Sequence, residues 1–130
     1  MELLRELVAV PSVSGEEAAV AALVEERARG WGLPVVRDAA GVSVRIAGKA
    51  PGRTLALVSH LDVVPPGSGW TRDPFTPVIE EGRLFGRGSG DAKASVAAML
   101  TAAHDVAAGG GPRRGDLLLL FGLGEETRTT

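Results

Sequence analysis

Two uninterrupted apolar runs constrain the fold more than any other feature of the sequence. Residues 54–59 (TLALVS) and 116–122 (DLLLLFG) have the length of strands, and their continuous apolar character is typical of strands covered on both faces in a parallel sheet. An alanine-rich segment between them, from about Ala92 to Ala108, predicts a helix. Strand, crossover helix and parallel strand together predict a three-layer α/β/α domain with a mostly parallel central sheet.

Shorter patterns predict the remaining elements. Residues 2–10 have the apolar spacing of a short amphipathic helix. Ser14 and Glu17 have the spacing of a capping box, which predicts the start of a second helix. Residues 35–48 (VVRDAAGVSVRIAG) alternate apolar and polar side chains around a turn, so they predict a hairpin at the sheet edge. Residues 78–86 (VIEEGRLFG) predict a second hairpin that turns at its Glu-Gly pair.

Composition excludes several classes of partner and chemistry. The length of 130 residues fits one domain, and a net charge of -2 offers no attraction for nucleic acid or a lipid surface. The absence of cysteine excludes disulfides and thiolate ligands, and it fits a reducing, cytoplasmic location. No secretory signal and no apolar run of membrane-spanning length is present, so we expect a protein without membrane contact.

Five polar residues lie next to the predicted buried elements. His60 and Asp62 follow the first apolar run, Asp91 precedes the alanine-rich helix, and Glu125 and Glu126 follow the second run. Because the carboxyl ends of parallel strands share one edge of a sheet, we expect all five at that rim. Imidazole and carboxylate donors suit zinc, manganese or cobalt. The carboxylate after the histidine can accept its second ring N–H, and one of two adjacent glutamates can serve as a general base.

Each motif also has an ordinary structural interpretation. The His-x-Asp pair can be a surface hydrogen bond, Asp91 can be a helix N-cap, and adjacent glutamates can be solvated charge. The glycine-rich stretch at residues 86–95 (GRGSGDAKAS) is no nucleotide site, because it lacks the third glycine of a dinucleotide fingerprint and the Gly-Lys-Ser/Thr of a phosphate loop. The metal-site interpretation therefore depends on the motifs meeting in space.

Three segments together resemble a known family. Residues 59–100 (SHLDVVPPGSGWTRDPFTPVIEEGRLFGRGSGDAKASVAAML) are similar to the signature region of the acetylornithine deacetylase, succinyl-diaminopimelate desuccinylase, aminoacylase and glutamate carboxypeptidase family of di-metal hydrolases. Residues 11–17 (PSVSGEE) and 122–127 (GLGEET) resemble its flanking motifs. At residues 92–95 the chain has Ala-Lys-Ala-Ser, where many family members have Met-Lys-Gly-Gly.

The resemblance implies a site with two divalent metal ions, zinc or else cobalt or manganese. By motif position, His60 would bind one ion, Asp91 would bridge both, and Glu126 would bind the other. Glu125 would be the general base and Asp62 would orient the histidine. The family also has a cis peptide bond directly after the bridging aspartate.

The resemblance also implies an activity and an assembly. We expect a metal-dependent amide hydrolase acting on a small N-acyl amino acid, foremost N-acetylornithine in arginine biosynthesis. Succinyl-diaminopimelate desuccinylase, dipeptidase or carboxypeptidase activity is an alternative, and a non-catalytic binding or regulatory module is one of another class. Family chains are longer and contain a lid domain that dimerises. Residues 1–130 are thus expected to be the N-terminal portion of a catalytic domain, inactive alone, from a homodimeric protein.

Overall fold

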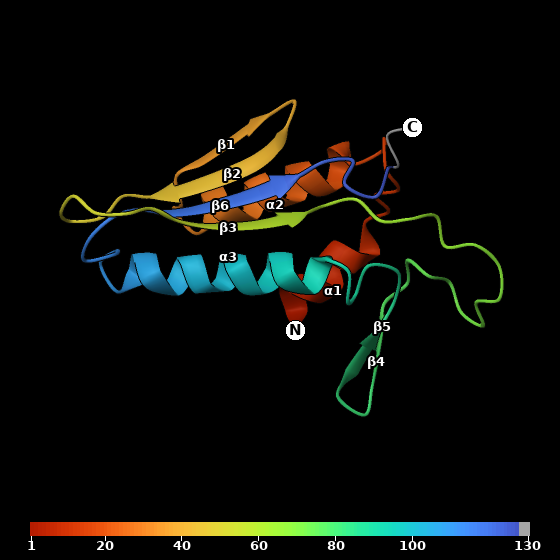
Figure 1. Ribbon diagram of the computed structural model, residues 1–130. Coiled ribbons are helices and arrows are strands. Elements are labelled where there is room, and N and C mark those ends of the chain that lie inside the picture. Colours follow the sequence, from red (N-terminus) through yellow and green to blue (C-terminus); the bar gives the residue numbers. More distant parts are fainter. Residues whose placement is uncertain (128–130) are drawn as a thin grey trace.

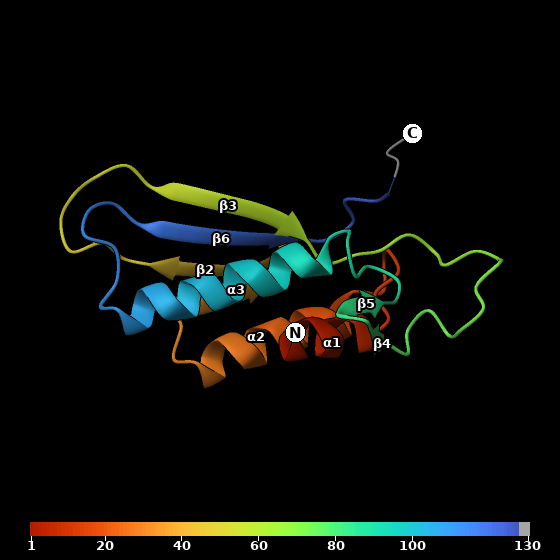
Figure 2. The ribbon, with the colours of Figure 1, turned by 90° about the horizontal axis from the view of Figure 1, so that it is seen from below.

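A four-stranded sheet with helices packed against one face organises the protein, as seen in a computed structural model that describes residues 1–127 (Figures 1 and 2). The helices are α1 (Glu2–Ala9), α2 (Ala18–Gly30) and α3 (Lys93–Ala108). The strands are β1 (Val35–Asp38), β2 (Gly41–Ile46), β3 (Leu55–His60), β4 (Val78–Glu80), β5 (Arg83–Phe85) and β6 (Leu117–Gly122).

The strand order of the main sheet is β1-β2-β6-β3. Strands β3 and β6 are parallel, with Leu57 opposite Leu119 and His60 opposite Gly122, and α3 connects them. This confirms the α/β class, the crossover helix and the parallel pair of apolar strands. Among the strand pairings of the main sheet within residues 1–127 only this one is parallel, because β2 joins both β6 and β1 in antiparallel fashion.

One face of the sheet carries the hydrophobic core. Helix α2 lies against β1 and β2, and α3 lies against β3 and β6 (Figure 2). The buried side chains that face these helices from the two central strands are Val42, Val44, Ile46, Leu117, Leu119 and Phe121. The expectation that both apolar strands are covered on both faces is wrong within residues 1–127, since Val58, which points away from the helices, is 70% exposed. All three described helices lie on the face that carries the core.

The hairpin β4–β5 stands apart from the main sheet (Figure 1). Its turn residues Glu81 and Gly82 have φ values of 48° and 75°, the left-handed geometry of a tight hairpin turn, as the sequence predicted. None of the helices within residues 1–127 combines the length and apolar character needed to cross a membrane.

Helix α2 does not begin with the capping box that the sequence suggested. Glu17 is the N-cap residue, but its side chain makes no capping bond to the helix. The Ser14 hydroxyl donates to Asp62, which is 48 residues away in the chain, at 2.6 Å. The capping-box prediction is therefore wrong, because both side chains bind partners outside the helix.

Candidate metal centre

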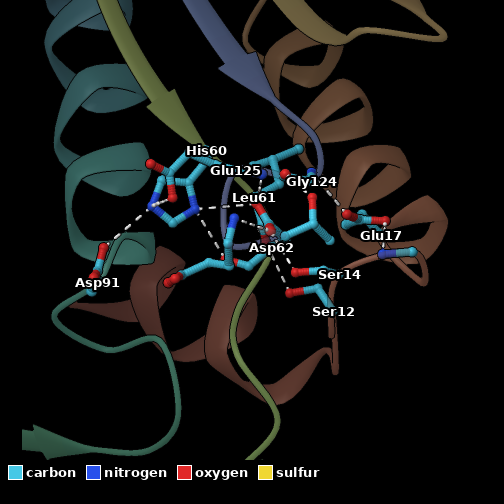
Figure 3. A network of polar contacts seen from close by, with 12 residues as sticks. Ser12, Ser14, Glu17, His60, Leu61, Asp62, Asp91, Gly124 and Glu125 are labelled. Carbon is cyan, nitrogen blue, oxygen red and sulfur yellow. Dashed lines mark hydrogen bonds and ion pairs between the residues drawn. The ribbon is translucent and has the colours of Figure 1, made fainter. Parts of the chain in front are cut away.

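His60 is the last residue of β3 and lies at the carboxyl end of the parallel pair. Its side chain is only 12% exposed, and Nδ1 lies 3.1 Å from the Asp62 carbonyl oxygen and 3.2 Å from Asp62 Oδ1. The opposite nitrogen, Nε2, lies 3.2 Å from Asp91 Oδ1 and 3.9 Å from Glu125 Oε2 (Figure 3). When Nδ1 donates its proton to Asp62, the lone pair of Nε2 is directed toward the carboxylates.

Asp62 connects three segments of the chain from a fully buried position. Its carboxylate accepts hydrogen bonds from the Ser14 hydroxyl at 2.6 Å and from the backbone N–H groups of Glu125 and Glu126 at 3.1 and 2.8 Å. Burial raises the pKa of Asp62, but these donors outweigh it and hold the pKa below its ordinary value. Asp62 therefore stays ionised and holds His60 and the loop after β6 together.

Glu125 and Glu126 occupy the loop that follows β6. His60, Glu125 and Glu126 each offer one ligand atom, and these three atoms lie within 4.8 Å of one another. Glu125 is exposed and Glu126 is half-buried, so both carboxylates are accessible from solvent. An imidazole and two carboxylates at this spacing form a donor set suited to a divalent transition-metal ion.

Asp91 lies across from His60 at the start of α3 (Figure 3). The helix N-cap residue is Ala92, without a side-chain capping bond, so Asp91 does not have the ordinary N-cap role. The Asp91 side chain is 83% exposed, and its Oδ1 contacts His60 Nε2. The peptide bond between Asp91 and Ala92 is cis, as the family resemblance led us to expect.

Lys93 anchors the segment that carries Asp91. Its side chain is fully buried, and Nζ donates to the carbonyl oxygens of Leu7 at 2.9 Å and Val10 at 2.7 Å. These carbonyls lie at the C-terminal end of α1, where the Leu7 carbonyl also accepts the Val10 N–H at 3.3 Å. Burial lowers the pKa of Lys93 to about 8. The ammonium group satisfies the end of one helix and holds the first turn of another beside it.

The charges around His60 favour a bound cation. Burial lowers the pKa of His60, but Asp91, the Asp62 carbonyl and the nearby carboxylates of Asp62 and Glu125 outweigh it and raise the pKa above its ordinary value. The imidazole thus faces several negative groups through one nitrogen, and Asp62 binds the other. A neutral histidine and ionised carboxylates are suitable ligands for a divalent metal ion. The hydrogen bond from Nδ1 of His60 to Asp62 fits this role, because it leaves Nε2 free to bind the ion.

All five residues singled out in the sequence lie at this rim. Nε2 of His60 faces Asp91 and Glu125, and Asp62 lies behind the imidazole. Sequence reasoning missed three supporting residues: Ser14, Glu17 and Lys93. The motif around residues 11–17 did mark the first two, but its local interpretation as a helix start concealed their contacts with the rim. Nothing in the alanine-rich pattern marked Lys93 as buried.

The sequence and the fold place the chain in a known class of proteins. Residues 56–129 match the model for peptidase family M20/M25/M40, which is more than half of the chain. The chain therefore belongs to this peptidase family.

Solved structures agree with this assignment. An M20 family metallo-carboxypeptidase, Sso-CP2 from Sulfolobus solfataricus, is 28% identical with a TM-score of 0.81, covering 95% of this chain and 30% of that chain. Human carnosine dipeptidase 1 is 22% identical with a TM-score of 0.83, covering 99% and 32%. The YXEP protein of Bacillus subtilis, described as a dinuclear metal-binding peptidase from the M20 family, is 17% identical with a TM-score of 0.67, covering 91% and 33%. The chain thus spans about a third of the length of these structures.

Proposed function

We propose that the protein containing this chain is a metal-dependent hydrolase that cleaves an amide bond in a small N-acylated amino acid or short peptide. The observation that supports this most is the meeting of His60, Glu125 and Glu126 at the carboxyl end of β3 and β6 in a member of a peptidase family. The three ligand atoms come from the ends of two strands and lie within 4.8 Å of one another, which is close enough for all three to bind one cation.

Each residue at the rim has its own task. His60, Asp91 and Glu126 would hold the divalent metal ions, Asp91 by its resemblance to the family's bridging aspartate. Such cations polarise the scissile carbonyl and make water acidic near neutral pH. Asp62 keeps the imidazole in the tautomer that presents Nε2.

Glu125 acts as the general base and then as the general acid. Its carboxylate is exposed at the rim, within 3.9 Å of His60 Nε2, where a substrate and a water molecule can approach it. It removes the proton from the water as the oxygen bonds to the carbonyl carbon, and it delivers that proton to the nitrogen as the C–N bond breaks. The products are a carboxylic acid and an amine.

A substitution of Glu125 tests the assignment in the full-length protein. We expect Glu125→Gln to lower turnover by about 100-fold to 10,000-fold while the zinc content stays at the parental level, because a general base is lost and the ligands remain. Glu26→Gln, an exposed glutamate of α2, is the matched control and should retain parental turnover. Turnover of Glu125→Gln within tenfold of the parent would remove Glu125 from this role, and loss of zinc would make it a ligand instead.

Two substrate classes follow from different observations. The resemblance of residues 59–100 favours N-acetylornithine or N-succinyl-diaminopimelate. Similarity to solved structures of a carboxypeptidase and a dipeptidase favours a short peptide. Assaying N-acetylornithine, N-succinyl-diaminopimelate and a dipeptide panel with zinc, cobalt and manganese in turn separates the classes by kcat/KM and identifies the preferred metal.

The proposal includes a larger catalytic domain. The chain spans about a third of its structural relatives, and the uncovered face of β3 exposes Val58. We propose that residues 1–130 form the N-terminal part of that domain, within a homodimeric cytoplasmic enzyme that also contains a lid domain. Gel filtration and light scattering on the full-length protein test the dimer.

A further inference from the structure

The segment between α1 and α2 runs alongside the residues that follow β3. The Ser12 hydroxyl donates to the Leu61 carbonyl at 2.8 Å, and the Val63 N–H donates back to the Ser12 carbonyl at 2.9 Å. The Ser14 N–H donates to the Val63 carbonyl at 3.3 Å, which completes a short parallel bridge. This segment is therefore fastened to the same stretch of chain that contains Asp62.

Glu17, at the end of that segment, reaches the loop after β6. The residue is 6% exposed, and its two carboxylate oxygens accept from different backbone groups. Oε2 accepts the N–H of Gly15 at 2.9 Å, and Oε1 accepts the N–H of Gly124 at 3.0 Å (Figure 3). The second bond spans 107 residues of sequence and ends immediately before Glu125.

Two buried carboxylates thus bind three successive N–H groups of one loop. Glu17 binds Gly124, and Asp62 binds Glu125 and Glu126. Charge-assisted hydrogen bonds of this kind are stronger than bonds between neutral groups, and a buried N–H without a partner is costly. The backbone that carries Glu125 and Glu126 is therefore fixed from both sides.

We infer that Glu17 is a positioning residue for the metal centre: by holding the Gly124 N–H it keeps the glutamate loop in the orientation that presents Glu125 and Glu126 toward His60. The inference rests on the proposed function, because it takes the rim to be a metal site. Glu17 itself touches neither substrate nor metal. Its effect passes through the loop backbone, as is usual for residues that support metal ligands.

Glu17→Gln is the sharpest substitution for testing this inference. Glutamine has nearly the same shape, but only one of its two terminal atoms accepts a hydrogen bond. The amide NH₂ must then face either Gly15 or Gly124, so one backbone N–H loses its acceptor. Glu25→Gln is the matched control, since Glu25 lies on α2, the helix that Glu17 precedes, and pairs with Arg29 and Arg37 away from the rim.

Zinc binding and amide exchange are measured on the full-length protein, with parent and variants compared at a temperature where all remain folded. We expect Glu17→Gln to weaken zinc affinity by about 10-fold to 100-fold in calorimetric titration, and Glu25→Gln to stay within twofold of the parent. Without metal, the Gly124 amide should exchange with solvent at least tenfold faster in Glu17→Gln. A change in global stability alone does not alter the zinc affinity of protein that remains folded.

The outcomes separate the two proposals. If the parent binds zinc, and Glu17→Gln exchanges the Gly124 amide faster but binds zinc within twofold, the positioning role is overturned and the metal centre stands. Unchanged Gly124 exchange means that the glutamine oxygen still accepts the Gly124 N–H. Glu17→Ala, which removes both acceptors, must then weaken zinc affinity at least tenfold, and a zinc affinity within twofold of the parent overturns the role. If the parent itself binds none of zinc, cobalt and manganese, the proposed function fails, and the inference about Glu17 fails with it.

Discussion

The two ends of the β3–β6 pair are both fastened by an aspartate, yet they differ in charge. At the site end, buried Asp62 accepts hydrogen bonds from Ser14 and from the backbone of Glu125 and Glu126. At the other end, Asp116 precedes β6 and accepts the Gly48 N–H at 2.9 Å through Oδ1. Each carboxylate thus ties together segments that are distant in sequence.

The charge of Asp116 is compensated and that of the site end is not. Arg45 donates to Asp116 Oδ2 through Nε at 2.8 Å and Nη2 at 2.5 Å. At the site end the carboxylates of Asp62, Asp91 and Glu125 face one histidine. Negative charge gathered around a single imidazole is costly unless a cation joins it. The difference indicates that one end of the sheet is built for structure and the other for binding.

The structural end is also closed by contact between backbones. Gly115 has a φ of 65°, and a Cβ atom placed on it would lie 2.0 Å from the Arg53 carbonyl oxygen. The Gly115 N–H donates to the Ala50 carbonyl at 3.0 Å. The loops at this end leave no space for a side chain or a ligand at this position.

The largest effect is expected from Asp62→Asn. The substitution places an NH₂ group among N–H and O–H donors, so it should lower the free energy of unfolding by about 3 kcal/mol. Zinc affinity should also fall, by about 10-fold to 100-fold, because His60 and the glutamate loop lose their common support. Urea denaturation and calorimetric titration of the full-length protein measure the two quantities. Unchanged zinc affinity would mean that the two ends of the sheet do not differ as we describe.

A smaller effect, on stability alone, is expected from Gly115→Ala. The added methyl group meets a carbonyl oxygen and the residue keeps a left-handed conformation, so unfolding should become easier by about 2 kcal/mol. Zinc affinity should stay within twofold, because this glycine lies at the end of β6 away from the rim. Gly67→Ala is the control, because Gly67 is an exposed glycine of similar φ with open space around it. It measures the cost of a non-glycine residue in the left-handed conformation without the clash. A weakened zinc affinity in Gly115→Ala would show that the two ends are coupled.

The smallest effect is expected from Asp116→Asn, and it depends on pH. The Gly48 N–H and Arg45 hold the pKa of Asp116 below its ordinary value. The ionised carboxylate therefore stabilises the folded state above the unfolded-state pKa, and this contribution is lost as pH falls through the folded-state pKa. The variant should be less stable than the parent at pH 7, and the difference should shrink at pH 3 and below. Urea denaturation at both pH values measures it, and a difference independent of pH would contradict the assignment.

The elements were predictable where the signal was local. The apolar runs of β3 and β6, the alanine-rich α3 and the Glu81–Gly82 turn all depend on residues within one element, and each is confirmed. The meeting of His60 with the two glutamates was predictable too, because parallel strands place their carboxyl ends at one edge.

Predictions failed where a distant partner competed with a local one. Ser14 and Glu17 have the spacing of a capping box, but Asp62 and Gly124 bind these side chains instead. A buried carboxylate and a loop N–H without another partner gain more from these bonds than a solvated helix terminus gains from a cap. The sequence pattern alone contains no information about that competition.

The sequence by itself determined the strands, the crossover helix and the set of residues able to hold a metal, because periodicity and residue chemistry are properties of short segments. Only the tertiary structure decided how that set is supported. Glu17 reaches Gly124 across 107 residues, and Lys93 reaches the end of α1 across 86 and 83. Such bonds form because folding buries donors and acceptors that must then find partners among whatever segments packing brings near.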